Sequence, residues 1–262
     1  MEQDTIQIVK RTVGLLLLLA AAAGIGGALL WFFGSPWAAA AAQRDIQAYV
    51  QLSYPGRELT IEKASYNVST RGYQALVEDP AQEDAFFTVS VKDGQVFADS
   101  YEADVNQKGN TIRRLEEAYT ELVQKRLEEL ELPAPLRPTV RLDEASAELV
   151  QLGMTFSQKG PLHYHLMLEG TEFPPTLDTA AQLLGQIYAQ MDTAEYDFVS
   201  YGVQLEKDGS AIAVAQVLPS QIKGGNLARI LQLALEGDSE NGVYISIRTP
   251  QEPLGESEPA GE

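Results

Sequence analysis

The sequence contains no cysteine, only two histidines, and about half as many basic residues as acidic ones. Without cysteine the chain can form no disulfide, offers no thiolate as a nucleophile or metal ligand, and carries no site for a cysteine-linked lipid. With 19 Lys and Arg against 37 Asp and Glu, its net charge of -18 would repel a phosphate backbone. We therefore expect no nucleic-acid partner, and a fold that is stabilised by packing alone.

Charge is also missing from one long stretch near the start, residues 12–43. Residues 13–33 supply 21 consecutive mostly apolar positions, and a helix needs about 20 to cross the hydrocarbon of a bilayer. Trp31 and Trp37 lie at the far end, where membrane proteins concentrate interfacial aromatics. We predict a transmembrane anchor at residues 13–35 that contacts the lipid bilayer.

The flanking charges predict the orientation of this anchor. Lys10 and Arg11 precede the run and only Arg44 follows it closely, which is a modest excess of positive charge on the N-terminal side. We expect residues 1–12 to be cytoplasmic and the bulk of the chain to be extracytoplasmic, on the outer side of the cell membrane. A cleaved signal peptide is the alternative, although its apolar region is usually only about 7–15 residues long.

After the anchor, alternating and helical hydrophobic patterns follow one another, which predicts an α+β fold class. The helical pattern at 110–130 offers a cover for the sheet of the first domain, and Asp-Gly pairs at 93–94 and 208–209 predict tight hairpins. We expect an N-terminal transmembrane helix followed by two small α+β domains, each an antiparallel sheet packed with helices. The predicted boundaries are a first α+β domain at 44–131, a linker at 132–138, a second α+β domain at 139–249 and a tail at 250–262.

Proline and acidic residues set the last two of these segments apart. Three of the seven residues at 132–138 are proline, which is typical of a semi-rigid linker. The tail at 250–262 contains three prolines, four glutamates and no base, so it cannot build a core and we expect it to be disordered.

The two histidines are the first place to look for chemistry. His163 and His165 alternate with apolar residues in a predicted strand at 162–169, so both would face outward, roughly 6.6 Å apart. A zinc site needs three or four ligands, and the nearest acid on that face, Glu169, is about 20 Å from His163 along a strand. No G-x-S-x-G nucleophile motif, phosphate-binding loop or dinucleotide fingerprint is present. We expect no catalytic, cofactor-binding or metal-binding residues.

Several aromatic and turn residues of the first domain form a recognisable series: Tyr54-Pro55-Gly56, Tyr66-Asn67-Val68, Tyr73, Phe87-Thr88-Val89 and Asp93-Gly94. In this order they resemble the N-terminal domain of the YfjL-like family of membrane-anchored bacterial proteins. Residues 173–235 are similar to the C-terminal domain of that family. The family has no assigned activity or catalytic residues, so the resemblance implies a bacterial host and no functional site.

Taken together, these patterns predict a membrane-anchored, extracytoplasmic, non-enzymatic protein of the bacterial envelope that binds an unidentified protein or peptide. Two alternatives stay open. One is an envelope enzyme or metal-dependent hydrolase that uses carboxylates with His163 and His165. The other is a small-ligand sensor that signals through the anchor.

Overall fold

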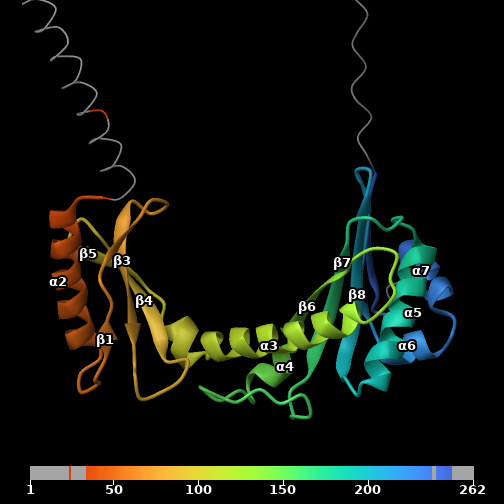
Figure 1. Ribbon diagram of the computed structural model, residues 1–262, viewed down its shortest axis with the longest axis horizontal. Helices are drawn as coiled ribbons and strands as arrows, with labels where there is room; N and C mark the ends of the chain where they lie inside the picture. The colour runs from red at the N-terminus through yellow and green to blue at the C-terminus, as the bar shows by residue number, and fades with distance from the viewer. Residues whose placement is uncertain (1–23, 25–33, 238–239, 250–262) are drawn as a thin grey trace, which may run out of the picture. The chain divides into compact units, whose positions relative to one another are not determined.

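A computed structural model describes residue 24 and residues 34–237 and 240–249 (Figure 1). Nearly all of the predicted anchor at 13–35 lies outside this range, as do the predicted cytoplasmic segment 1–12 and the tail 250–262. In the part of the chain that is described, no helix is both long and apolar enough to cross a membrane. The chain divides into two compact units, unit 1 up to Asn110 and unit 2 from Thr111.

Unit 1 is a helix packed on one face of an antiparallel sheet. Apolar and polar residues alternate along β4, and this alternation matches the burial: Phe87, Val89 and Val91 are buried, while Thr88 and Ser90 between them are partly exposed. The strand order is β1-β3-β4-β5, and β2 also pairs with β3. Its elements are α2 (Pro36–Ser53), β1 (Thr60–Ile61), β2 (Ser65–Asn67), β3 (Gly72–Glu78), β4 (Phe86–Lys92), β5 (Gln95–Asp99) and the π-helix η1 (Glu102–Asn106).

A carboxylate holds α2 to the edge of this sheet. Asp99 on β5 accepts hydrogen bonds from the Tyr49 hydroxyl at 2.8 Å and the Tyr54 hydroxyl at 2.5 Å. Burial, and then the hydrogen bond to Asp99, raise the pKa of Tyr54 far above its usual value. Tyr54 therefore stays a neutral donor, and the C-terminal end of α2 is fixed against β5.

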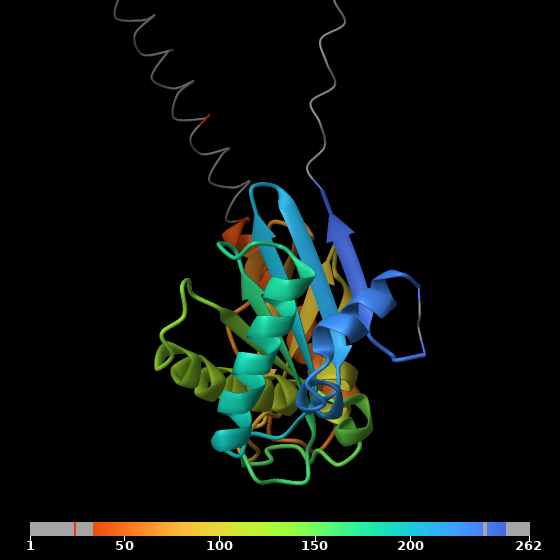
Figure 2. The ribbon, with the colours of Figure 1, turned by 90° about the vertical axis from the view of Figure 1, so that its right-hand side faces the viewer.

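Unit 2 contains a five-stranded sheet in the order β10-β9-β8-β7-β6, with helices α5 and α7 on one face (Figure 2). The core between the helices and the sheet is built from alternate strand residues such as Leu166, Leu168, Val203 and Leu205. The elements are α3 (Gly109–Glu128), β6 (Arg137–Leu142), α4 (Glu144–Ala147), β7 (Tyr164–Gly170), α5 (Leu177–Thr193), β8 (Phe198–Lys207), β9 (Ser210–Val217), α6 (Pro219–Lys223), α7 (Leu227–Leu235) and β10 (Tyr244–Arg248).

The sheet of unit 2 is mixed, which corrects the prediction of two antiparallel sheets. Strands β7 and β8 run parallel, whereas the other neighbouring pairs are antiparallel. Parallel neighbours need a long crossover connection, and α5 supplies it by packing Leu184 and Ile187 into the core on the way from β7 to β8. The fold class remains α+β.

Helix α3 belongs to a different unit from the one that we predicted. Its apolar stripe does bury itself, but Tyr119, Val123 and Leu127 lie in the core cluster of unit 2 rather than on the sheet of unit 1. The division between the units therefore falls after Asn110 and not after residue 131. The hydrophobic period predicted the helix correctly and could not specify which sheet it would cover.

The proline-rich segment at 132–138 is likewise packed into unit 2. Leu136 is buried, and the last two residues of the segment, Arg137 and Pro138, already form the start of β6. Proline is tolerated there because β6 is an edge strand of the sheet, where one row of backbone N–H groups has no strand to bond. The segment is thus an ordered edge of the second sheet instead of a linker.

Both predicted hairpin turns are confirmed. Asp93 and Gly94 have φ values of 52° and 77°, and Asp208 and Gly209 have 51° and 77°. Two consecutive positive φ angles are the signature of the type I′ turn, which an Asp-Gly pair favours. Both hairpins carry the tripeptide Lys-Asp-Gly, at 92–94 and 207–209. The turn type alone explains this repeat, since the two sheets differ in how their strands pair.

Two glycines of unit 2 make a matched test of this packing. A side chain at Gly202 on β8 would meet Met167 Cε at 2.6 Å and the Val214 carbonyl oxygen at 3.0 Å, whereas one at Gly185 in α5 meets nothing within 4 Å. We expect Gly202→Ala to lower the free energy of unfolding by about 1–3 kcal/mol. Gly185→Ala should raise it by about 0.5–1 kcal/mol, because alanine has the higher helix propensity. Urea unfolding followed by circular dichroism measures both, and a shift of the same sign in the two variants would contradict this packing.

Candidate functional site

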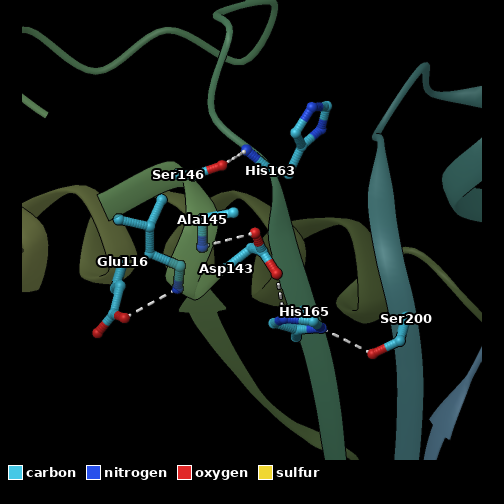
Figure 3. Close-up of polar contacts among 8 residues, drawn as sticks. Glu116, Asp143, Ala145, Ser146, His163, His165 and Ser200 are labelled. Atoms are coloured by element: carbon cyan, nitrogen blue, oxygen red, sulfur yellow. Dashed lines mark hydrogen bonds and ion pairs between the residues drawn. The ribbon is translucent and has the colours of Figure 1, made fainter. Parts of the chain in front are cut away.

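Three polar side chains from separate segments of unit 2 meet in one hydrogen-bonded chain (Figure 3). His165 Nδ1 lies 2.8 Å from Ser200 Oγ, and His165 Nε2 lies 3.2 Å from Asp143 Oδ1. His165 is on β7, Ser200 is on β8, and Asp143 directly follows β6. The site is therefore built across three neighbouring strands of the sheet.

The alternation of β7 puts His165 on the face that the helices leave open. Tyr164, Leu166 and Leu168 are buried in the core on one face of the strand, so His165 between them points to the other face. This part of the prediction is confirmed. His165 pairs with Arg141 on β6, which places Asp143, two residues further on, within reach of the imidazole.

A β-bulge brings Ser200 opposite the histidine. In the parallel pairing, Tyr164 lies opposite Phe198 but His165 lies opposite Ser200, so Val199 is an extra residue in β8. Without this bulge Val199 would take the position beside His165. Bulges often reorient a side chain next to a functional site, and here the bulge directs the Ser200 hydroxyl toward His165 Nδ1.

Both carboxylate oxygens of Asp143 take part in hydrogen bonds that hold the side chain in place. Oδ2 accepts the backbone N–H of Ala145 at 3.1 Å, where Asp143 caps the N-terminus of α4, and Oδ1 faces His165 Nε2. An ionised carboxylate only accepts hydrogen bonds, so Nε2 carries the imidazole proton. Nδ1 is then the acceptor for the Ser200 hydroxyl. Serine thus donates to histidine, and histidine donates to aspartate.

A cavity of about 300 Å³ opens beside Ser200 and His165. Val199 and Leu218 give it apolar walls, and Gln216 and Asn241 also line it. Gln216 has a φ of 61° in a second bulge, where β8 and β9 shift register. A left-handed backbone conformation is uncommon for a residue other than glycine and is often associated with functional sites.

The second histidine does not join this site. His163 lies just before β7, its ring is exposed and points away from the chain of three residues (Figure 3), and its backbone N–H donates to Ser146 Oγ at 2.9 Å. Among the described residues, no three His, Asp or Glu side chains are grouped closely enough to hold a metal ion. The two histidines thus have separate surroundings despite their spacing in the sequence.

Sequence reasoning missed Asp143 and Ser200, which are 22 and 35 residues away from His165. The spacing of residues along β7 carries no information about partners on other strands. The sequence places Asp143 shortly after Val140 and Ser200 shortly before the Asp-Gly turn at 208–209. Only the strand order and the bulge bring these two residues to His165.

A larger cavity of about 750 Å³ lies in unit 1, beside the first turns of α2. Its walls are mostly apolar, with Pro36, Ala39 and Ala40 on the helix and Ala64 and Tyr66 opposite. Among the described residues that line it, Lys63 is the one with a charged side chain. The cavity offers room for a ligand or an apolar side chain.

Comparison with known protein families assigns the first part of the chain. A family model described as the YfjL-like N-terminal domain matches residues 9–120. Residues 9–120 therefore carry a YfjL-like N-terminal domain. The match confirms the resemblance seen in the aromatic and turn residues, and the YfjL-like domain takes in unit 1 and the first half of α3. The similarity of residues 173–235 to the family's C-terminal domain lies beyond the match and stays a prediction.

A search of curated proteins and of solved structures gave no match to the chain.

The hydrogen bonds of His165 predict which of its ring nitrogens carries the proton in the neutral form. We expect the neutral His165 ring to be the Nε2–H tautomer, because the Asp143 carboxylate can only accept, whereas the His163 ring should exchange between tautomers. Ring ¹⁵N chemical shifts in the full chain at pH 8 distinguish the two. An averaged pair of nitrogen shifts for His165 that matches those of His163 would show that the chain of hydrogen bonds does not form.

Proposed function

We propose that the chain is a single-pass protein of the bacterial cell membrane whose extracytoplasmic units bind a protein or peptide partner. The uncharged, apolar stretch at residues 13–35 supports the anchor, and the YfjL-like domain match begins at residue 9, ahead of this stretch. The excess of acid supports a partner other than nucleic acid.

The observation that carries the binding role is the difference between the two edges of the sheet in unit 2. At the β6 edge the outward N–H groups are closed by α3: the N–H of Val140 donates to Thr120 Oγ1 at 3.0 Å and the N–H of Leu142 donates to Glu116 Oε1 at 2.9 Å. Pro138 lies two residues before Val140, on the same side of the strand, and has no N–H. This edge has no donor left to offer a further strand.

The opposite edge, β10, has no such cover. Within the described residues β9 is the one strand that pairs with β10, so the outer side of β10 has no neighbouring strand, although natural sheets usually block a bare edge. Tyr244 is 66% exposed and Ile247 is 48% exposed, and they point to opposite faces of the strand. A partner segment in extended conformation can add to this edge through backbone hydrogen bonds and contact both side chains.

The two alternatives receive different support. A metal-dependent hydrolase that uses His163 together with His165 is not favoured, because only His165 contacts other polar side chains of a shared site. A small-ligand sensor is favoured by the 750 Å³ cavity, since Gly34 and Ser35, the last residues of the predicted anchor, line it. Binding of an extended peptide at β10 remains our main proposal.

The proposed topology predicts which positions a membrane-impermeant thiol reagent can reach. The chain has no cysteine, so a single Ser69→Cys replacement at an exposed turn of unit 1 is the sole target. We expect this cysteine to be labelled in intact cells. A Gln3→Cys variant in the predicted cytoplasmic segment is the matched control and should react only after lysis. The reverse pattern would show the opposite orientation, and labelling of neither variant before lysis would place unit 1 inside the cell.

The β10 edge is tested by photo-crosslinking from a single position in living cells. Replacing Tyr244 with p-benzoylphenylalanine should give a discrete cross-linked product after irradiation, because the partner strand lies against it. The same replacement at Arg137, an exposed residue on the closed β6 edge of the same sheet, should give none. Equal products from both positions, or none from position 244, would contradict binding at β10.

A further inference from the structure

The chain from Asp143 through His165 to Ser200 has the order of partners that nucleophilic catalysis requires. We propose that Ser200 is a nucleophile that cleaves small carboxylic esters, with His165 as its general base and Asp143 as the positioning residue. This activity goes beyond the binding role and would replace the expectation of a non-enzymatic chain. It rests on the geometry of unit 2 and does not depend on the partner at β10.

The first support is the direction of the hydrogen bonds. A serine hydroxyl becomes a nucleophile when an adjacent base takes its proton and a third group orients that base. Here Nδ1 faces Ser200 Oγ at 2.8 Å and Nε2 faces Asp143 at 3.2 Å. In the usual serine hydrolase triad, Nε2 faces the serine and Nδ1 faces the carboxylate, so the two ring nitrogens have exchanged partners here. The lone pair of either imidazole nitrogen can accept the serine proton.

The second support is access. The His165 side chain is 40% exposed and that of Asp143 is 27% exposed, while Ser200 retains 6% exposure. The cavity of about 300 Å³ is lined by Ser200 and His165 and does not include Asp143. A substrate in the cavity would therefore meet the nucleophile and the base, with the orienting carboxylate behind them. The volume is near the lower limit for small-molecule sites, which favours a short acyl group.

The third support is the set of groups around the cavity. Asn241 Oδ1 accepts the Val243 N–H at 3.0 Å, which leaves the amide nitrogen of Asn241 as its donor. Amide side chains stabilise the oxyanion in other acyl-transfer enzymes, and Gln216 and Asn241 both line this cavity. Two bulges also converge here, at Val199 and at the left-handed Gln216, so the backbone deviates from regular pairing on both sides of Ser200.

The proposed reaction has two steps, acylation of Ser200 and hydrolysis of the acyl-enzyme. Ser200 Oγ forms a bond to the ester carbonyl carbon while its proton passes to His165 Nδ1, and the bond to the alcohol oxygen breaks as the alcohol takes that proton. Water then bonds to the acyl carbon and gives a proton to Nδ1. The bond from the acyl carbon to Oγ breaks, Ser200 recovers the proton, and the carboxylic acid leaves.

Covalent labelling tests the nucleophile directly. The full chain, purified in a mild detergent, is treated with a fluorophosphonate probe and digested, and mass spectrometry locates the adduct. We expect the adduct on Ser200, and we expect His165→Ala to slow labelling at least about 100-fold through loss of the general base. Ser210→Ala, at the far end of the neighbouring strand, is the matched control and should label at the rate of the unaltered chain.

Ester turnover separates catalysis from a structural role. We expect p-nitrophenyl acetate to be cleaved faster than the palmitate ester, and Ser200→Ala to lower kcat/KM at least about 100-fold. Asp143→Asn can still cap α4, so it should leave the thermal melting curve nearly unchanged while it lowers kcat/KM and alters its pH profile. A purely structural aspartate would change the melting curve and leave the pH profile as it was.

The proposal is overturned if the folded, unaltered chain gives no Ser200 adduct, or if Ser200→Ala cleaves the acetate ester as fast as the unaltered chain. Thermal melting of each variant shows that it is folded before its activity is judged. Photo-crosslinking from position 244 is read in living cells without any substrate, so failure of either proposal is recognised without reference to the other.

Discussion

The parallel pairing of β7 with β8 determines the arrangement of unit 2 more than any other contact. It is imposed by α5, which must cross over one face of the sheet to join two strands that run in the same direction. The crossover buries Leu184, Ile187 and Met191 and gives the unit its core. The same pairing places His165 beside Ser200 on the opposite face. The core and the candidate site are thus two faces of one strand pair.

Local patterns in the sequence predicted those features that depend on neighbouring residues. The alternation in β7, the type I′ turns at 93–94 and 208–209, and the helical pattern at 110–130 all agree with the structure. What the sequence could not predict depends on contacts between distant segments. The hydrophobic stripe of α3 is equally suited to either sheet, and only the positions of Tyr119 and Val123 in the second core decide between them.

The candidate site shows the same limit. His165 could be placed on the open face from the alternation of apolar residues around it. Ser200 joins it only because Val199 is bulged, and Asp143 joins it only because β6 is the antiparallel neighbour of β7. Neither fact has a local signal in the sequence. The proline-rich segment was misleading for a related reason: Pro138 breaks an internal strand but is acceptable on an edge, and edge position is a property of the whole sheet.

The closed β6 edge has a consequence for how copies of this chain can associate. A sheet with two bare edges can receive a strand on one side and offer the other to the next molecule, so that addition continues without limit and builds a fibre. Here Pro138, Thr120 and Glu116 leave no backbone donor on one side. Strand addition in unit 2 can therefore occur once, at β10, and then it stops. Crowded beside identical neighbours, such a unit can pair with a single strand without polymerising.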